Sequence, residues 1–329
     1  MAARFGLTGD VMLGRNVDAR QRHRDPDAVW GTMRDRLRAL DGLLVNLECC
    51  LSARGTRWTR TRRPFHFRAD PDWAVPALRA AGVDCCALAN NHVLDFGEVA
   101  LRDTLDHLDE AGIAHAGAGR DLDAALDPAT LSVGGLSVAV VSLTDNTPEY
   151  AADADSPGTA RAALAADDER SRRLAGEALS RAAATDPDVL VASLHWGPNM
   201  VTDPSGAHEA FGRWLVDRGV DLVHGHSAHV FQGIEVHDGA PILYDAGDFV
   251  DDYAVDEDRR NDRGFLFEVR IDDGGDIDAL RLRPTEIEDC QVHAAGPETA
   301  RWCREQMRSR SDPYGTAFER DGDDLVLSL

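Results

Sequence analysis

The sequence predicts a layered α/β fold in which short buried strands alternate with amphipathic helices. Three observations carry this prediction: short apolar runs that end in polar residues, helical periodicity between those runs, and a change to a strand-rich pattern after Val230. Alternation of short apolar runs with helical segments is typical of βαβ units, which build a largely parallel sheet covered by helices. At 329 residues the chain is long enough to bury a full core of this kind.

Apolar runs predict the strands of a first sheet: Phe5–Thr8, Leu43–Leu47, Val83–Ala89, Val138–Leu143, Val189–Leu194 and Val220–Val223. Stretches with apolar residues on one face predict helices: Asp27–Leu40, Trp73–Ala81, Glu98–Ala111, Asp167–Ala184 and Ala207–Asp217. After Val230, runs separated by Gly and Asp turns predict antiparallel strands of a second sheet that closes over the first: Ile234–Val236, Ile242–Tyr244, Phe265–Ile271 and Ile277–Leu282.

Residues 1–296 are predicted to form a single domain, and residues 297–329 a C-terminal extension. Within the domain, the stretch Asp145–Asp168 is rich in Asp, Ala, Pro and Gly and predicts a long loop. The extension is predicted to hold a short helix, Glu298–Arg308, followed by an acidic tail whose pattern predicts no further element.

The charge of the chain is strongly acidic and unevenly placed. The formal net charge is −23, and all 35 basic residues are Arg. Residues 1–68 hold 14 Arg and 7 acidic residues, whereas the rest hold 21 and 51. The negative field of such a chain repels nucleic acid and anionic membranes. High salt screens the repulsion among its own charges, so the fold should be more stable there. We therefore expect a halophilic, salt-rich cytoplasm. The alternative, an acidic protein from a GC-rich genome, explains Arg in place of Lys but not the acid excess.

The cysteines and the N-terminus also favour a cytoplasmic setting. The six Cys, at positions 49, 50, 85, 86, 290 and 303, have neither a zinc spacing nor the pattern of a disulfide framework. The N-terminal sequence MAARFGLTGD lacks an apolar signal region. The longest apolar stretch, near Leu136–Leu143, is too short to span a bilayer. A reduced chain without a membrane segment is the expectation.

Residue types that ligate metals follow five of the predicted strands, where α/β sheets collect their ligands. In chain order they are Asp10, Glu48, Asn91, His195, His226 and His229. The alternative is a set of loop caps and turn formers, because Asn and Asp favour turns in any case. His224, two residues before one of these histidines, is expected to be a strand residue or an outer partner of the ligands.

Two divalent cations explain these residue types. A pair about 3.5–4 Å apart needs a bridging carboxylate and terminal neutral imidazoles. Mixed nitrogen and oxygen donors suit Mn, Fe or Zn better than Ca or Mg. Such a pair activates water for attack on phosphorus or a carbonyl carbon, with His92 protonating the leaving group. Asp95 is expected to orient His92 or to tighten its turn; the alternative role for His92 is an outer hydrogen-bond donor.

Residues 54–68 form the main positive segment, with six Arg and three aromatic residues, Trp58, Phe65 and Phe67. The planar guanidinium of Arg can donate two hydrogen bonds to one carboxylate or phosphate group. An anionic small molecule or polymer is therefore the expected ligand. The residues predicted to bind it are Arg15, Arg60, Arg62 and Arg63. The alternative is that these Arg neutralise neighbouring acids. Nucleic acid is disfavoured by the overall charge.

At these residues the chain resembles the poly-γ-glutamate capsule-synthesis (CapA) family, a branch of the calcineurin-like metallophosphoesterase superfamily. The resemblance lies in TGDVMLGR (8–15), NLE (46–48), LANNHVLDFG (88–97), AGIAHAGAG (111–119), SLHWG (193–197), GHSAHVFQGIE (225–235) and YDAGDF (244–249). These motifs follow the family order and span about three quarters of the chain. The resemblance implies a layered metallophosphoesterase-like β-sandwich flanked by helices.

The resemblance also implies roles. Asp10 and His229 would bind the first metal, with Glu48 bridging and His92 as proton donor. The second metal would take Asn91, His195 and His226. The chain departs from the wider superfamily at three positions: Met12 stands in place of a ligand His, Glu48 in place of Asp, and Asp248 where Asn is more frequent in the family. Because the first metal is then short of a ligand, a single-metal centre is the alternative.

Three functions follow from these observations. The first is a metal-dependent hydrolase acting on a phosphoester or on an anionic polymer such as poly-γ-glutamate. The second is a non-catalytic, metal-containing component of capsule or poly-γ-glutamate biosynthesis, with capsule-synthase proteins as partners. The third is a nuclease or nucleotidase, which would require salt-dependent binding of nucleic acid.

Overall fold

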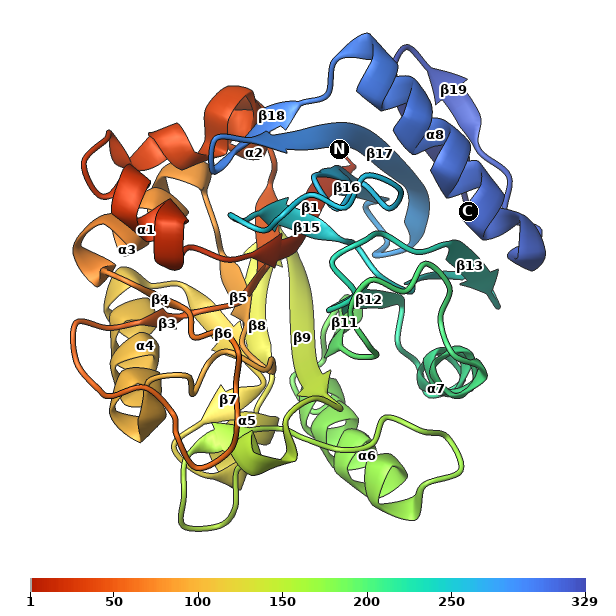
Figure 1. The fold of residues 1–329 in the computed structure, drawn as a ribbon. Coiled ribbons are helices and arrows are strands. Elements are labelled where there is room, and N and C mark those ends of the chain that lie inside the picture. The colour runs from red at the N-terminus through yellow and green to blue at the C-terminus, as the bar shows by residue number, and fades with distance from the viewer. Residues whose placement is uncertain (1) are drawn as a thin grey trace.

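Two β-sheets packed face to face form the centre of the protein, and helices cover the outer face of each (Figure 1). The computed structural model describes residues 2–329. Helices, sheet, sheet and helices give four layers. The predicted layered α/β fold is therefore confirmed.

The larger sheet is centred on β1. Its strands are β1 (Ala3–Val11), β2 (Gly42–Leu47), β5 (Cys85–Ala87), β6 (Ala114–Ala116), β15 (Asp248–Val250), β16 (Arg263–Ile271), β17 (Ile277–Glu288), β18 (Gln291–Ala294), β19 (Glu319–Asp321) and β20 (Asp324–Ser328). β1, β2, β5 and β6 run parallel to one another. β16, β17 and β20 extend the sheet in antiparallel order on the other side of β1.

The second sheet has six strands, and its inner four are parallel. Its strands are β8 (Ala129–Val133), β9 (Leu136–Thr144), β11 (Val189–His195), β12 (Leu222–His226), β13 (Ile234–His237) and β14 (Ala240–Leu243). β9, β11, β12 and β14 run parallel, and β8 and β13 close the two edges in antiparallel order.

Helices pack on both sides of the sheet pair (Figure 1). The larger sheet is covered by α1 (Arg15–Gln21), the 3₁₀ helix η1 (Pro26–Met33), α2 (Arg34–Leu37), α3 (Pro71–Ala81) and α4 (Gly97–Ala111). The second sheet is covered by α5 (Leu122–Leu126), α6 (Glu169–Ala183) and α7 (Gly206–Val216). α8 (Pro297–Ser311), followed by η3 (Asp312–Tyr314), packs on β17 and β13 at the edge of the pair.

Alternate residues of each central strand face different layers, as the two-residue period of a strand requires. In β2, Val45 packs beneath the helices, whereas Leu44 faces the second sheet. In β9, Val140 faces the larger sheet, whereas Val141 packs with the residues of α6. Both faces of these strands are therefore buried, which explains their nearly continuous apolar sequences.

The strands predicted before Val230 are all present, as β1, β2, β5, β9, β11 and β12. The strands predicted after Val230 exist, but they do not form a sheet of their own. β13 and β14 join the second sheet, whereas β16 and β17 join the larger one. β14 is antiparallel to β13 but parallel to β12. Pairing with an existing edge satisfies backbone groups that would otherwise be open, and this explains the division.

The predicted helix Asp27–Leu40 is confirmed only in part. The segment forms a 3₁₀ helix, η1, and the four-residue helix α2. Gly31 interrupts it with a positive φ of 43°. A Cβ at Gly31 would lie 2.4 Å from the carbonyl oxygen of Val292, so close contact with β18 forces the break.

Two segments predicted to be irregular contain short strands. The stretch Asp145–Asp168 is mostly loop, but it holds η2 (Pro148–Tyr150) and β10 (Gly158–Thr159), which pairs with β7 (Ala118–Gly119). The acidic tail contains β19 and β20, and β20 pairs with β17. The tail is therefore part of the larger sheet.

The Arg-rich segment is anchored at both ends. β3 (Cys50–Leu51) and β4 (Arg68–Ala69) pair in parallel and hold residues 52–67 as a loop next to the larger sheet. The six cysteines are free and buried. Among residues 2–329, no helix combines the length and the apolar character needed to cross a membrane.

Candidate metal centre

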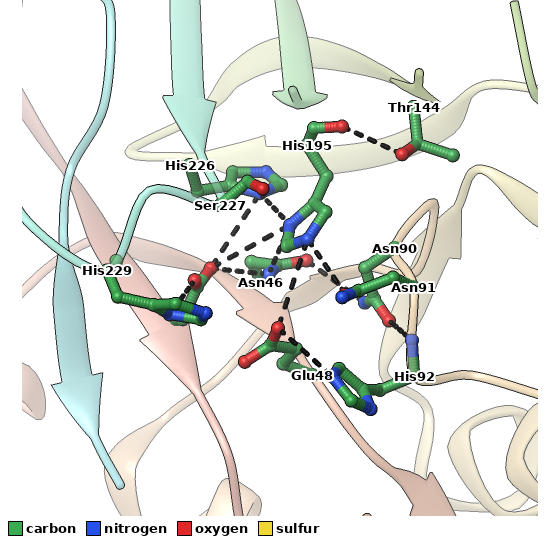
Figure 2. A network of polar contacts seen from close by, with 12 residues as sticks. Asn46, Glu48, Asn90, Asn91, His92, Thr144, His195, His226, Ser227 and His229 are labelled. Carbon is green, nitrogen blue, oxygen red and sulfur yellow. Dashed lines mark hydrogen bonds and ion pairs between the residues drawn. The ribbon is translucent and has the colours of Figure 1, made fainter. Parts of the chain in front are cut away.

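Parallel strands of both sheets deliver polar side chains to one end of the sheet pair. Asp10 lies in β1, and Glu48 directly follows β2. His195 ends β11 and His226 ends β12, and the two residues are paired in register. Asn91 lies between β5 and α4. Figure 2 shows both histidines, Glu48 and Asn91 around a common centre, as the strand-end prediction requires.

Glycines allow the backbone to pack closely behind this centre. A Cβ at Gly9 would lie 1.9 Å from the carbonyl oxygen of Gly247, and one at Gly225 would lie 2.1 Å from that of Tyr244. The amide of Asp10 donates to the carbonyl of Gly247 at 2.8 Å. Side chains at these glycines would push the segments apart, so the glycines bring Asp10 close to the histidines of the second sheet.

The donor atoms form two groups that share Asp10. One group is Asp10, His195 and His226, and the other is Asp10, Glu48 and His229, with the atoms of each group within 4.8 Å of one another. In the first, Asp10 Oδ1 lies 3.8 Å from His226 Nδ1. In the second, Asp10 Oδ2 lies 3.3 Å from His229 Nδ1. Two cations at these places would therefore share the carboxylate of Asp10.

Glu48 and Asn91 both approach His195. Glu48 Oε1 is 3.9 Å from His195 Nε2, so this carboxylate also reaches the first group. Asn91 Oδ1 is 3.0 Å from the same nitrogen. The structure thus brings all six sequence-predicted ligands together. Both Asp10 and Glu48 have positions from which they can bridge, whereas the resemblance alone implied Glu48.

Unpartnered buried oxygens indicate that the cluster fits cations. Asp10 Oδ2, Glu48 Oε1 and Asp248 Oδ2 are buried and have no hydrogen-bond partner. A buried carboxylate oxygen without a partner costs more free energy than an ordinary lost hydrogen bond. Cation coordination satisfies such atoms. The mixture of carboxylate, amide and imidazole donors is of the kind that binds divalent transition metals, so the residues fit a metal ion.

Burial and the crowding of carboxylates shift the pKa values of the cluster in different directions. Burial and repulsion from Asp10 raise the pKa of Glu48 well above its usual value. Burial lowers the pKa of His195 to about 4 and that of His226 well below its usual value. Burial alone would lower the pKa of His229, but Asp248, Glu48 and Asp10 together raise it. Neutral imidazoles are the form that ligates metals, and a cation would relieve the carboxylate repulsion.

Three further residues contact the candidate ligands, and the sequence pattern assigned none of them such a role. Asn46 donates from Nδ2 to Asp10 Oδ1 at 2.7 Å. The Tyr253 hydroxyl donates to Glu48 Oε2 at 3.0 Å. Asp248 Oδ1 lies 2.8 Å from His229 Nδ1. Asn46 and Asp248 stand inside the motifs NLE and YDAGDF, which was a usable signal, whereas Tyr253 stands outside every motif.

A buried hydroxyl orients the histidines of β12 from behind. Ser193 Oγ lies 2.9 Å from His226 Nε2 and 3.2 Å from His224 Nδ1. The Nε2 atom of His224 faces the carbonyl oxygen of Thr8 at 2.8 Å. Because Ser193 contacts Nε2 of His226, Nδ1 is the nitrogen that faces the cluster, 2.9 Å from His195 Nδ1 and 3.8 Å from Asp10 Oδ1. His224 is thus an outer partner that also links the two sheets.

His92 is held in one orientation beside the cluster. Its Nδ1 lies 2.5 Å from Asp95 Oδ2, and its ring stacks on Phe67 with a centroid separation of 3.8 Å. Its Nε2 lies 3.8 Å from Glu48 Oε1. Asp95 also accepts the Tyr150 hydroxyl at 2.9 Å. Burial lowers the pKa of His92, and the carboxylate of Asp95 partly offsets this effect.

The four predicted anion-binding arginines have different surroundings. Arg63 donates to the carbonyl of Asn91, and its Nε lies 3.4 Å from Asp95 Oδ1, so other residues of the protein hold it. Arg60 is exposed and lies over the Trp58 ring, and Arg62 is exposed. Arg15 lines a cavity next to His92 and His229. Of the four, Arg15 is therefore the one placed for contact with a ligand at the centre.

Two packed sheets with carboxylate, amide and imidazole donors at their strand ends define a metallophosphoesterase-like fold. Residues 4–253 match the family described as "Bacterial capsule synthesis protein PGA_cap", and the chain belongs to this family. It is 33% identical to "Probable polyglutamine synthesis accessory protein" of Mycobacterium tuberculosis, over 97% of this chain and 94% of that protein.

More distant relatives agree with this assignment. "PGA biosynthesis protein CapA" of Bacillus subtilis is 29% identical, over 75% of this chain and 62% of that one. "Capsule biosynthesis protein CapA" of Bacillus anthracis is 28% identical, over 75% and 59%. The crystal structure of a hypothetical protein from Thermus thermophilus has a TM-score of 0.50 at 19% identity, and the match covers 86% of this chain and 99% of that one. That likeness supports the fold.

Metal loading is expected to stabilise the protein. At a Mn²⁺ concentration of 100 times Kd the ion would add about 2.7 kcal/mol, which corresponds to a rise in Tm of about 5 °C. The measurement is a thermal melt with and without chelator, together with elemental analysis. His237→Ala should show the same rise in Tm, because His237 lies with the exposed Asp217 and Asp238, in a separate group from the candidate centre. An unchanged Tm and no bound metal in the unsubstituted protein would contradict the assignment.

Proposed function

We propose that the protein is a metal-dependent hydrolase that acts on a phosphoester or on an anionic polymer such as poly-γ-glutamate. The observation that carries this proposal is the cluster of six donors with unpartnered buried oxygens, next to an oriented imidazole. Two divalent cations held there would supply Lewis-acid stabilisation of developing negative charge and an activated water. The acid excess of the chain supports a salt-rich cytoplasm as its setting.

The residues around the cluster divide into ligands and a proton-transfer pair. The cations would be held by Asp10, Glu48, Asn91 and the three histidines His195, His226 and His229. His92 directs its Nε2 toward Glu48 while Asp95 holds the opposite nitrogen. A histidine fixed in this way can give a proton to the oxygen of a leaving group that lies between it and the cations. Tyr253 and Asn46 position the two carboxylates.

The relatives' names favour a second candidate function. They describe an accessory protein of polyglutamine synthesis and proteins of capsule biosynthesis. In that role the metal centre would be structural, and the protein would act with capsule-synthase partners. Stoichiometric metal without turnover of any phosphoester or polymer, combined with capture of a synthase, would support this candidate over the hydrolase.

Turnover by the purified protein tests the hydrolase proposal. With Mn²⁺ present, p-nitrophenyl phosphate, bis(p-nitrophenyl) phosphate and a poly-γ-glutamate oligomer are each incubated at high salt. We expect hydrolysis of at least one, loss of that activity with chelator, and its return when Mn²⁺ is restored. His226→Ala should be inactive and His237→Ala fully active. Equal rates in these two variants would show that the activity does not come from the candidate centre.

A further inference from the structure

A cavity of about 600 Å³ opens directly beside the candidate metal centre. His92 and His229 face it from the side of the metal ligands. Phe65 and Phe67, from the anchored loop, form one wall, and the segment around Tyr253 forms another. Volumes of 300–1,000 Å³ are typical of sites for small organic ligands. The cavity therefore has room for a substantial group attached to whatever binds at the centre.

The lining of this cavity is mainly apolar and aromatic, and so is its rim. Among residues 2–329 four large hydrophobic side chains are exposed, and Phe65 (53%) and Val255 (50%) both line the cavity. A third, Val201 (37%), directly follows Met200, which also lines it. Exposed apolar side chains that gather at a cavity mouth indicate a binding surface, whereas single ones scattered over a protein do not.

The charges in the lining do not suit a polyanion. Arg15 is its single Arg, and Asp256 contributes a carboxylate. Arg15 already lies 3.4 Å from Asp252, and its guanidinium is over the rings of Phe65 and Phe67 at 5.0 and 5.7 Å. A polymer with a carboxylate on every unit would place several charges against aromatic walls with one cation that is already paired. Desolvating those charges is unfavourable.

The position of His92 connects the cavity to the chemistry. His92 lies between Glu48 and the cavity, so the oxygen that takes its proton would carry the organic group into the cavity. In such a step water forms a bond to phosphorus, and the bond from phosphorus to the organic oxygen breaks. The electron pair leaves with that oxygen, which takes the proton from His92. The attacking water releases a proton to solvent, and His92 takes up a proton from solvent before the next cycle.

We propose that this cavity binds the flat apolar or aromatic organic group of a phosphoester whose phosphoryl group lies at the metal centre. The proposal rests on the proposed function and selects the phosphoester over the anionic polymer. Phe65, whose side chain is 53% exposed and whose ring lies 18° from parallel to that of the buried Phe67, provides stacking surface for such a group. Phe65 is then a specificity-determining residue for the candidate site.

Phosphonates, which are not hydrolysed, test the proposal by binding alone. The full chain loaded with Mn²⁺ is titrated calorimetrically with 1-naphthylphosphonate and with methylphosphonate. We expect the naphthyl compound to bind at least tenfold more tightly. Phe65→Ser should reduce this preference to threefold or less without changing metal content. Val99→Ser is the matched control, because Val99 is similarly exposed (45%) but lies on α4, outside the cavity lining.

Three results would each overturn the proposal: equal affinities for the two phosphonates, no binding of either, or an unchanged preference in Phe65→Ser. Displacement of the naphthyl compound by a tighter-binding poly-γ-glutamate oligomer would also overturn it. Parallel assays with 1-naphthyl and methyl phosphate separate this inference from the hydrolase proposal. Preferential binding without turnover supports the cavity and contradicts the hydrolase, whereas turnover with equal kcat/KM supports the hydrolase and contradicts the cavity.

Discussion

Asp10→Asn is expected to abolish binding of both metal ions and to lower phosphoester hydrolysis by at least about 10³-fold, because metal ions supply several kcal/mol of transition-state stabilisation. Asp10 is the one residue common to both donor groups. The side-chain amide of Asn has the shape of the Asp carboxylate but lacks its negative charge. Asn46 Nδ2 donates a hydrogen bond to Asp10 Oδ1, and the amide oxygen of Asn can still accept it. Removing the charge therefore weakens both groups at once, whereas a change at His226 or His229 affects one group directly.

The metal content of this variant is measured by elemental analysis after equilibration with Mn²⁺, and its rate by product release. Asp217→Asn makes the same chemical change in the exposed group with His237 and is the control. We expect this control to keep its metal and its activity. Retention of two metals and of the full rate in Asp10→Asn would show that the carboxylate is not the shared ligand.

His92→Asn is expected to lower kcat by about 10²–10⁴-fold, the usual contribution of a positioned proton-transfer group. The metal content should not change, because His92 belongs to neither donor group and its Nε2 is 3.8 Å from Glu48. The loss should be greatest for esters with a poorly leaving alkoxide and least for p-nitrophenyl phosphate, since a good leaving group needs little protonation.

Rates for a series of leaving groups distinguish the two roles that the sequence left open for His92. A loss that grows with the pKa of the leaving alcohol supports proton donation. The same loss for every ester, combined with reduced metal content, would instead assign His92 to holding the metal ligands. Asp95→Asn, which keeps the shape of the partner that contacts His92 Nδ1, should follow the same leaving-group trend more weakly.

The sequence was informative where local pattern and parallel topology act together. Asp10, Glu48 and His195 each stand at the end of a strong apolar run, and the carboxyl ends of parallel strands meet at one edge of a sheet. Their convergence could therefore be predicted without contacts. The sequence could not predict which carboxylate is common to both donor groups. That depends on the distances between side chains of the two facing sheets.

Long-range packing decided the features that the sequence missed. β20 is a short strand in an acidic tail, and its pairing with β17 is set by an open sheet edge far away in the chain. Gly31 breaks a helical pattern because β18 packs against it. Arg63 looked like an anion-binding residue, but the fold gives it internal partners. Tyr253 reaches Glu48 from a loop with no recognisable motif.

Anomalous diffraction from Mn²⁺-loaded crystals would test most directly whether these distant segments build one two-metal centre. Two peaks about 3.5–4 Å apart, one on each side of the Asp10 carboxylate, are the result expected for a pair that shares this ligand. The histidines of β11 and β12 should lie beside one peak and His229 beside the other. Full Mn²⁺ occupancy elsewhere, for example at Asp217 and His237, with no peak at Asp10, would contradict the account.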